Sequence, residues 1–313
     1  MFFARRYQRR HQPSRTLFFC AFALCLFSAC GAPKNSNTPA PSRRQITDDS
    51  GKQVSLPPQV NRVVSLAPNL TEIVFAVGGG NQLVGRTSYC DFPAEAKAVA
   101  EVGDTLHPSL ERIIALKPQV VLVSTASQLE GFTRQLQEHD IAVFVTDPHD
   151  LDGVFRSIDQ IGDILGAAEK AKQLTDALKR RVMILAQKLH VAPPVRVFYQ
   201  LSAEPLYTAG KDSFVNDLIM FAGGISVTAD VPGAWPKYSA EAALATKPEA
   251  IILPTGGSMG DSNMEVAEPL KRSPAVLNGR VYKINGDLLV RPGPRAIDGL
   301  EELARVLHPE RFK

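Results

Sequence analysis

Two glutamates occupy the same position of a sequence pattern that occurs twice, 130 residues apart. Segments 109–123 and 239–253 agree at five of fifteen positions, and each predicts a short helix, a Lys-Pro stop and a buried strand. Glu111 and Glu241 lie on the first turns of these helices. There the helix dipole favours a carboxylate by about 0.3 to 1 kcal/mol. The repeat predicts two related α/β lobes, and the space between two lobes is the usual place for a ligand.

Three aromatic residues follow predicted strands or lie in irregular segments. Trp235 is the only tryptophan and lies between two prolines at 232 and 236, while Tyr89 and Tyr207 lie in loops of the first and second lobes. Aromatic rings bury a flat apolar area while their polar tips stay hydrated. The three side chains can therefore line both sides of a flat apolar ligand such as a macrocycle. Alternatively, Trp235 covers an edge of the second core.

A rigid turn at 289–295, just before the last predicted helix, carries Arg291 and Arg295. The fork of donors on an arginine can hold a phosphate, an amide carbonyl or a carboxylate. Arg295 can equally bridge the lobes or cap structure. Asn69 follows the first strand of the first lobe, at the edge where open α/β sheets bind ligands. With Glu72 three residues later, Asn69 also fits a helix N-cap and its reciprocal partner.

Metal and catalytic motifs are scarce. His107 lies in a loop from which it can reach a ligand, but the remaining histidines show no ligand spacing, which argues against a bare zinc or manganese receptor. Cys90 is expected to be a small packed residue. The chain has no nucleophile elbow, phosphate-binding loop, His-Glu-x-x-His motif or cysteine pair, so we predict no catalysis and no intrinsic cofactor. A two-lobed hydrolase and a structural lipoprotein without a ligand remain the alternatives.

The N-terminus is typical of an exported protein. Residues 1–29 carry five arginines and no acid, followed by an uncharged apolar run that ends in small residues before Cys30, as in a signal peptide. Residues 30–44 are rich in proline, asparagine and serine and are expected to form a disordered tether. Loss of residues 1–29 lowers the formal net charge from +3 to −2, because their five positive charges leave with them. The mature chain then has no basic surface for nucleic acid.

The rest of the chain predicts an N-terminal lobe over 45–150, an interlobe helical region over 151–190 and a C-terminal lobe over 191–313. A hairpin at 46–56 precedes alternating strands and helices, which argues for doubly wound parallel sheets. No Gly- or Pro-rich hinge separates the lobes, so we expect a continuous helix between them and modest rocking. The predicted strands are 62–66, 83–87, 120–124, 142–146, 195–201, 225–228, 250–253 and 280–284, and the predicted helices are 70–77, 110–116, 128–139, 151–165, 167–190, 214–221, 240–245 and 296–307.

Segments 62–73, 88–93, 110–118, 207–211 and 231–236 together resemble the periplasmic-binding family for cobalamin and ferric siderophores. The resemblance runs from about residue 45 to 309. It implies two Rossmann-like lobes joined by a single long backbone helix, and capture of a metal chelate for an ABC permease dimer with a cytoplasmic ATPase. We expect the receptor to be a monomer.

The resemblance is greatest to the cobalamin-binding members, and it implies roles for individual residues. Asp287, four residues before Arg291, would contact the ligand together with that arginine. Glu111 and Glu241 match paired surface glutamates that meet arginines of the permease. We favour docking over helix capping for this pair, because the glutamate is kept in both repeats while its neighbours change.

Two departures bear on the ligand and the anchor. Thr105 and Ser124 stand where the cobalamin-binding relatives carry further tryptophans, so heme or a ferric siderophore remains an alternative ligand. Residues 26–31 resemble a lipoprotein lipobox, with Phe27 in place of the usual leucine. This resemblance implies lipidation of Cys30 and attachment to a membrane outside the cytoplasm.

Overall fold

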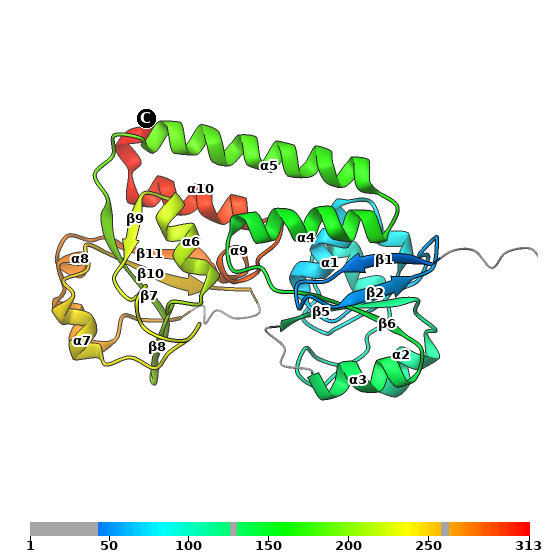
Figure 1. The fold of residues 1–313 in the computed structure, drawn as a ribbon. Coiled ribbons are helices and arrows are strands. Elements are labelled where there is room, and N and C mark those ends of the chain that lie inside the picture. The colour runs from blue at the N-terminus through cyan, green and yellow to red at the C-terminus, as the bar shows by residue number, and fades with distance from the viewer. Residues whose placement is uncertain (1–42, 126–129, 258–262) are drawn as a thin grey trace, which may run out of the picture. The chain divides into compact units, whose positions relative to one another are not determined.

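The computed structural model describes residues 43–125, 130–257 and 263–313, which form two larger β-sheets, a two-stranded hairpin and the surrounding helices (Figure 1). The predicted signal peptide and Cys30, with nearly all of the predicted tether, lie outside these residues. Within them, no helix has both the length and the apolar character needed to span a bilayer.

The predicted hairpin is present. Strand β1 (Arg44–Thr47) pairs antiparallel with β2 (Gln53–Leu56). The turn is organised by the buried Asp48, whose carboxylate accepts hydrogen bonds from the Ser50 and Lys52 amides, each at 3.0 Å. An aspartate that binds backbone amides ahead of it is a standard way to close such a turn.

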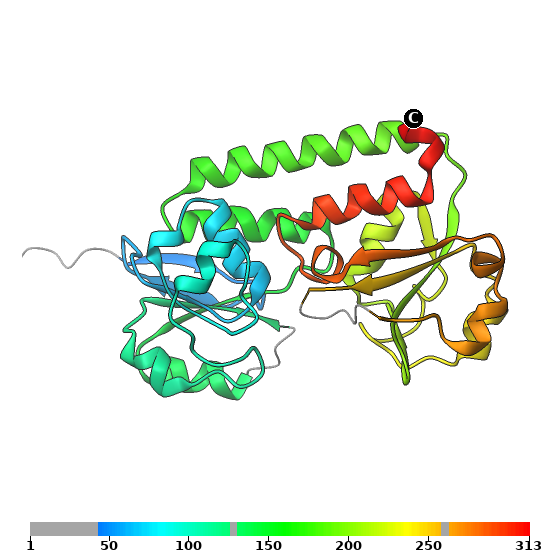
Figure 2. The ribbon, with the colours of Figure 1, turned by 180° about the vertical axis from the view of Figure 1, so that it is seen from behind.

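The first lobe contains a four-stranded parallel sheet in the order β4–β3–β5–β6. All five residues of β5 are buried, as expected for a parallel strand covered on both faces. Helices on the two faces complete what we call the first lobe (Figure 2). Its elements are β3 (Val63–Ser65), α1 (Pro68–Ala76), β4 (Leu83–Arg86), α2 (Leu110–Ala115), β5 (Val120–Ser124), α3 (Glu130–Glu138) and β6 (Ala142–Thr146).

The second lobe repeats this topology. Its parallel strands lie in the order β9–β7–β10–β11, so in both lobes the second strand along the chain flanks the first, and the third and fourth follow on the other side. An additional strand, β8, pairs antiparallel with β7. The elements are β7 (Val195–Ala203), β8 (Leu206–Thr208), α6 (Phe214–Phe221), β9 (Gly224–Ser226), α7 (Ala240–Ala245), β10 (Ala250–Thr255), α8 (Pro274–Leu277), β11 (Val281–Asn285), α9 (Gly286–Val290) and α10 (Ala296–Leu307). The shared strand order supports the relation between the halves that the repeat predicts.

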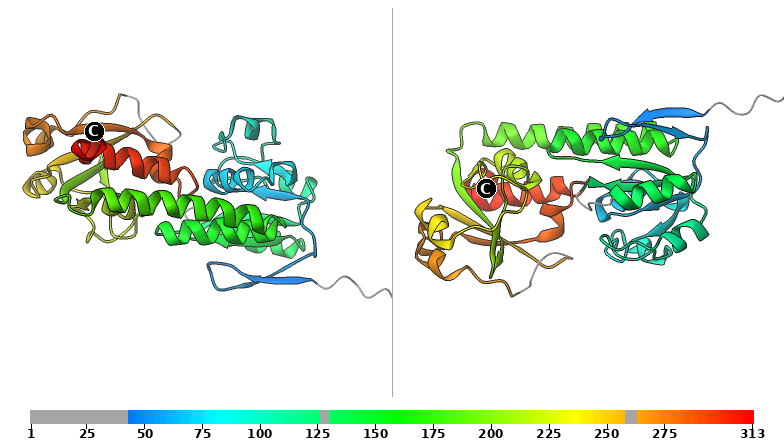
Figure 3. Two further views of the ribbon diagram at one scale, coloured as in Figure 1. Left: turned by 90° about the horizontal axis from the view of Figure 1, so that it is seen from above. Right: turned by 60° about the horizontal axis from the view of Figure 1, so that its bottom comes forward.

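Two helices occupy the connection between the sheets. Helix α4 (Leu151–Ile164) contacts α1 of the first lobe and α6 of the second, and α5 (Ala168–Leu189) packs against both α4 and α10 (Figures 1 and 3). At 1.5 Å per residue, α5 is about 33 Å long. One apolar cluster includes Val63 of the first sheet, Ile158 and Leu178 of these helices, and Val197 of the second sheet. Apolar packing therefore continues through α4 and α5.

One local prediction is wrong. Asn69 and Glu72 do not form a capping box, because α1 begins two residues earlier than predicted, with Pro68 in its first turn and Ala67 as the N-cap. Proline suits that position, since the amide it lacks would have no partner within the helix. The side chains of Asn69 and Glu72 instead contact the turn before α10. Strand β8 and helices α8 and α9 were not predicted, and short 3₁₀ turns cover Gly80–Gln82, Ala94–Ala98, Glu268–Arg272 and Pro309–Phe312.

We expect stability to depend on pH through Asp217 of α6. Its carboxylate accepts a 2.7 Å hydrogen bond from the Leu151 amide, and burial raises its pKa, with Asp150 and Asp152 adding to that effect. A raised carboxyl pKa favours the folded state in acid, and this contribution is lost as pH rises through the folded pKa. In Asp217→Asn, the free energy of unfolding should therefore fall less than in the wild-type protein as the pH rises above about 4.

Urea unfolding at pH 4, 6 and 8 measures this effect. Asp176→Asn is a control of opposite sign, because the Lys172 side chain lowers the pKa of Asp176. An identical decline in the Asp217 variant and the unchanged protein would contradict the prediction.

Candidate functional site

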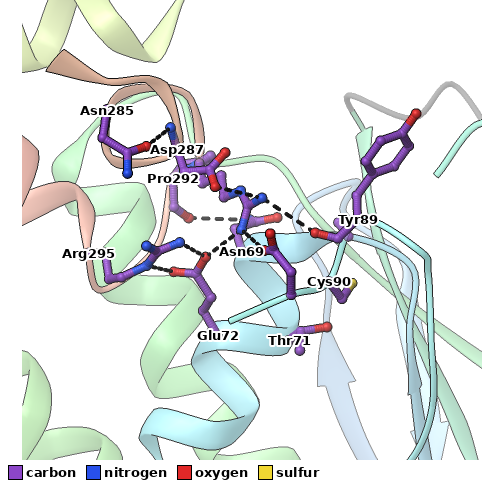
Figure 4. A network of polar contacts seen from close by, with 12 residues as sticks. Asn69, Thr71, Glu72, Tyr89, Cys90, Asn285, Asp287, Pro292 and Arg295 are labelled. Atoms are coloured by element: carbon purple, nitrogen blue, oxygen red, sulfur yellow. Dashed lines mark hydrogen bonds and ion pairs between the residues drawn. The ribbon is translucent and has the colours of Figure 1, made fainter. Parts of the chain in front are cut away.

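Arg291 connects side chains of both lobes. It follows α9, and its side chain is 5 % exposed. One terminal nitrogen donates to Glu72 Oε1 at 3.1 Å and to Asp91 Oδ1 at 3.0 Å, while the other lies 3.0 Å from Asp287 Oδ2 and donates to the Tyr89 carbonyl at 3.4 Å (Figure 4). The structure thus brings Arg291 together with two other predicted ligand residues, Asp287 through its side chain and Tyr89 through its backbone carbonyl. A fourth, Asn69, contacts the residue that follows Arg291.

Glu72 holds a second arginine in the same network. Arg295 donates through Nε to Glu72 Oε2 at 2.9 Å and through Nη2 to Oε1 at 2.6 Å, which is the bidentate geometry that makes such pairs strong. The guanidinium also lies 3.9 Å from the ring centroid of Phe92. Asn69 Nδ2 donates to the Pro292 carbonyl at 3.3 Å. Of the roles considered for Arg295, which are ligand binding, bridging of the lobes and capping, its side-chain contacts with Glu72 support bridging.

The charges in this network are mutually satisfied. Glu72, Asp91 and Asp287 contribute three carboxylates against the two guanidinium groups. Partial burial raises the pKa of Asp91, but the hydrogen bond and the charge interaction with Arg291 lower it by more. The pKa of Asp91 therefore lies below its ordinary value. Burial lowers the pKa of Arg295, yet Glu72 raises it above the ordinary value. Both shifts favour the ionised forms.

Two of the predicted aromatic residues lie in the second lobe. Trp235 is half-buried and its ring centroid lies 6.1 Å from that of Tyr199 on β7, while Tyr207 is half-buried on β8. Trp235 therefore covers part of the second core and also exposes part of its ring. Tyr89, in the first lobe, is 48 % exposed.

Backbone contacts fix the segment that carries Trp235. The Gly210 amide donates to the Ala234 carbonyl at 3.0 Å, and the Thr208 amide donates to the Pro236 carbonyl at 3.2 Å. A Cβ at Gly210 would collide with the Gly233 carbonyl oxygen, so only glycine allows this approach. The segment is thus positioned by β8 and the turn after it.

His107 and Cys90 have ordinary surroundings. His107 is exposed, and its Nδ1 lies 3.3 Å from Asp104 Oδ2. Cys90 is buried, as predicted, beside the Thr87 hydroxyl at 3.2 Å, and burial raises its pKa. Among the residues described, no three histidine, cysteine or acidic side chains are grouped so as to hold a metal ion.

Glu111 and Glu241 are exposed on equivalent helix starts. Ser109 caps α2 by accepting from the Arg112 amide at 3.3 Å, and Ser239 caps α7 by accepting from the Ala242 amide at 3.2 Å. Serine rather than glutamate therefore provides the N-cap in both repeats. Glu241 also accepts a 2.8 Å hydrogen bond from the Ser239 hydroxyl, and its own backbone amide together with this bond lowers its pKa.

A cavity of about 930 Å³ lies elsewhere in the first lobe, beside the hairpin and the ends of β5 and β6. Ser124, Arg134 and Lys52 are among its lining residues. None of the predicted ligand residues lines it.

Comparison with known proteins identifies relatives of the chain. The model of the family described as periplasmic binding protein matches residues 63–288. The chain is 32% identical to the ABC transporter substrate-binding lipoprotein YvrC of Bacillus subtilis, over 93% of this chain and 96% of the relative. It is 29% identical to a vitamin B12-binding protein of Photorhabdus laumondii, over 79% and 88%. The crystal structure of the vitamin B12 binding protein BtuF of Vibrio cholerae superposes with a TM-score of 0.72 and 25% identity, over 81% of this chain and 99% of that chain.

Proposed function

The chain belongs to the periplasmic binding protein family, and on that premise we propose that it captures a corrinoid such as cobalamin between its lobes. The family makes it the substrate-binding component of an ABC transporter, acting outside the cytoplasm and without catalysis. This excludes the hydrolase alternative. The proposal concerns the ligand, the residues that bind it and the way the protein meets its permease.

The engagement of both Arg291 and Arg295 by carboxylates is the observation that most favours a corrinoid. The contacts of Arg291 include three carboxylates, and Arg295 is held by one of them. An anionic chelate such as heme or a ferric catecholate would need cationic side chains to bind, but both arginines of this network are engaged by carboxylates. The network also has one more carboxylate than guanidinium groups, so it would repel an anion. Cyanocobalamin is neutral and bears amide side chains, which can exchange hydrogen bonds with such a network without this repulsion.

The aromatic residues are the proposed apolar surfaces for the macrocycle. Tyr89 presents an exposed ring from the first lobe beside the Arg291 network, while Trp235 and Tyr207 present partly exposed rings from the second. Asn69, Asp287 and Arg291 would provide the polar contacts. His107 is a weaker candidate, since its exposed ring is engaged with Asp104.

Docking is assigned to Glu111 and Glu241. Their exposure on the first turns of α2 and α7, at equivalent positions of two lobes with the same strand order, suits a partner with two-fold symmetry. Helix α5 would act as the backbone that keeps the lobes 45–150 and 191–313 at a suitable spacing within a monomer. The lipid on Cys30, joined through the tether, would hold this receptor near the permease and its ATPase.

Competition among ligands of different charge tests the choice of ligand. We expect cyanocobalamin to bind, and we expect hemin and a corrinoid bearing carboxylates in place of its amides to bind at least about tenfold more weakly, because each 1.4 kcal/mol of repulsion is a factor of ten. Calorimetric titration with each compound measures the affinities. Tighter binding of hemin than of cyanocobalamin would instead identify a heme receptor.

A further inference from the structure

We propose that Glu72 is a positioning residue that fixes the separation of the two lobes before any ligand binds. Its carboxylate is supplied by α1 of the first lobe, while its partners Arg291 and Arg295 precede α10 of the second. We call Glu72, Arg291 and Arg295 the interlobe latch.

Both oxygens of Glu72 are used across the lobes. Oε1 accepts from Arg291 at 3.1 Å and from Arg295 at 2.6 Å, and Oε2 accepts from Arg295 at 2.9 Å. The Glu72 side chain is 2 % exposed, so water competes little for these bonds. The pair Arg291–Asp91 also crosses between the lobes, but Asp91 is 41 % exposed and its contribution is correspondingly smaller.

The latch is a second attachment between the lobes. The first attachment is the chain itself, which passes through α4 and α5 and is supported by continuous apolar packing. A single attachment would permit rotation about it. A polar contact between α1 and the turn before α10 opposes that rotation, because movement would separate buried opposite charges.

Removal of the Glu72 carboxylate is expected to affect two properties that can be measured separately, the stability of the fold and the separation of the lobes. Glu72→Gln leaves a poorly compensated Arg295, which destabilises the fold, and it also removes the ion pairs that Glu72 makes across the lobes. Glu72→Gln combined with Arg295→Met removes that guanidinium along with the carboxylate. The double variant should recover part of the lost stability while the lobes remain released. A purely structural role would predict recovery of both properties together.

Asp287→Asn is the matched control. Asp287 is 7 % exposed and pairs with the same Arg291 at 3.0 Å, yet the two residues are four positions apart within the second lobe. This variant therefore alters a buried partner of Arg291 and leaves the contacts of Glu72 in place.

Distances between spin labels on the two lobes, measured by double electron–electron resonance without ligand, test the proposal. Glu95→Cys and Leu277→Cys provide exposed sites in the full chain, with Cys20, Cys25 and Cys30 changed to serine and the buried Cys90 retained. Thermal unfolding is followed in the same samples.

We expect a narrow distance distribution for the unchanged protein and for Asp287→Asn, and a broader distribution with a longer population for both Glu72 variants. A narrow distribution in the folded double variant would overturn the proposal, even if Glu72→Gln alone fails to fold. Because no ligand is present, this result is independent of whether the protein binds a corrinoid.

Discussion

Transport of cyanocobalamin should fall at least about 100-fold in the double variant Glu111→Lys and Glu241→Lys, while its affinity for the protein stays unchanged. Like charges placed together at an interface cost several kcal/mol, and 1.4 kcal/mol is a factor of ten. Both side chains are exposed, and serines cap both helices, so reversal of these charges should leave the fold intact. Neither glutamate contacts the network around Arg291 in any hydrogen bond or ion pair described.

Uptake of labelled cyanocobalamin in cells that contain the permease, together with titration of the purified variant, measures the two quantities separately. Glu169→Lys with Glu310→Lys is the control, since it makes the same change of charge at exposed sites on α5 and near the C-terminus, away from α2 and α7 (Figure 1). Equal loss of uptake in the control would mean that net charge, and not docking, is responsible. Loss of affinity in the test variant would remove the docking assignment.

Affinity for cyanocobalamin should fall by about 1 to 3 kcal/mol in Trp235→Ala, which is about 5-fold to 150-fold, because a partly exposed tryptophan on a ligand is a typical binding hot spot. The same ring packs on Tyr199, so we also expect some loss of stability. The measurement is therefore made well below the melting temperature of the variant.

Tyr238→Ala separates the two effects. Tyr238 packs on the β7 residue Phe198 with ring centroids 6.4 Å apart, close to the 6.1 Å of the Trp235–Tyr199 pair. This variant should lose stability and keep its affinity. Unchanged affinity in Trp235→Ala, or equal loss in both variants, would show that Trp235 is only a packing residue.

Periodicity and turn chemistry predicted most of the fold. Strands β5 and β6 and helices α6, α7 and α10 occur at the predicted residues, because each is a clear apolar pattern bounded by a cap or a turn. Helix α9 was missed since it is five residues long and merges with β11. Strand β8 was missed because three residues carry too little alternation to be recognised.

The site was less predictable. The spacing of Asn69 and Glu72 fits a local capping box, but their partners are more than 200 residues away in the sequence. Local spacing carries no information about such pairing. Arg291 was singled out as a ligand candidate by its rigid turn, whereas its engagement with Glu72 and Asp91 became apparent only in the fold. The ligand-binding and docking roles of the named residues stay predictions.

Titration of the protein with cyanocobalamin, followed by the fluorescence of Trp235 and by heat, tests the central claim most directly. Trp235 is the only tryptophan in the chain, so its emission reports on one position in the second lobe. The account predicts saturable binding of one cyanocobalamin per chain, with a dissociation constant of about 1 μM or tighter, corresponding to about −8 kcal/mol, and a change in emission. Absence of saturable binding would contradict the assignment of a corrinoid ligand.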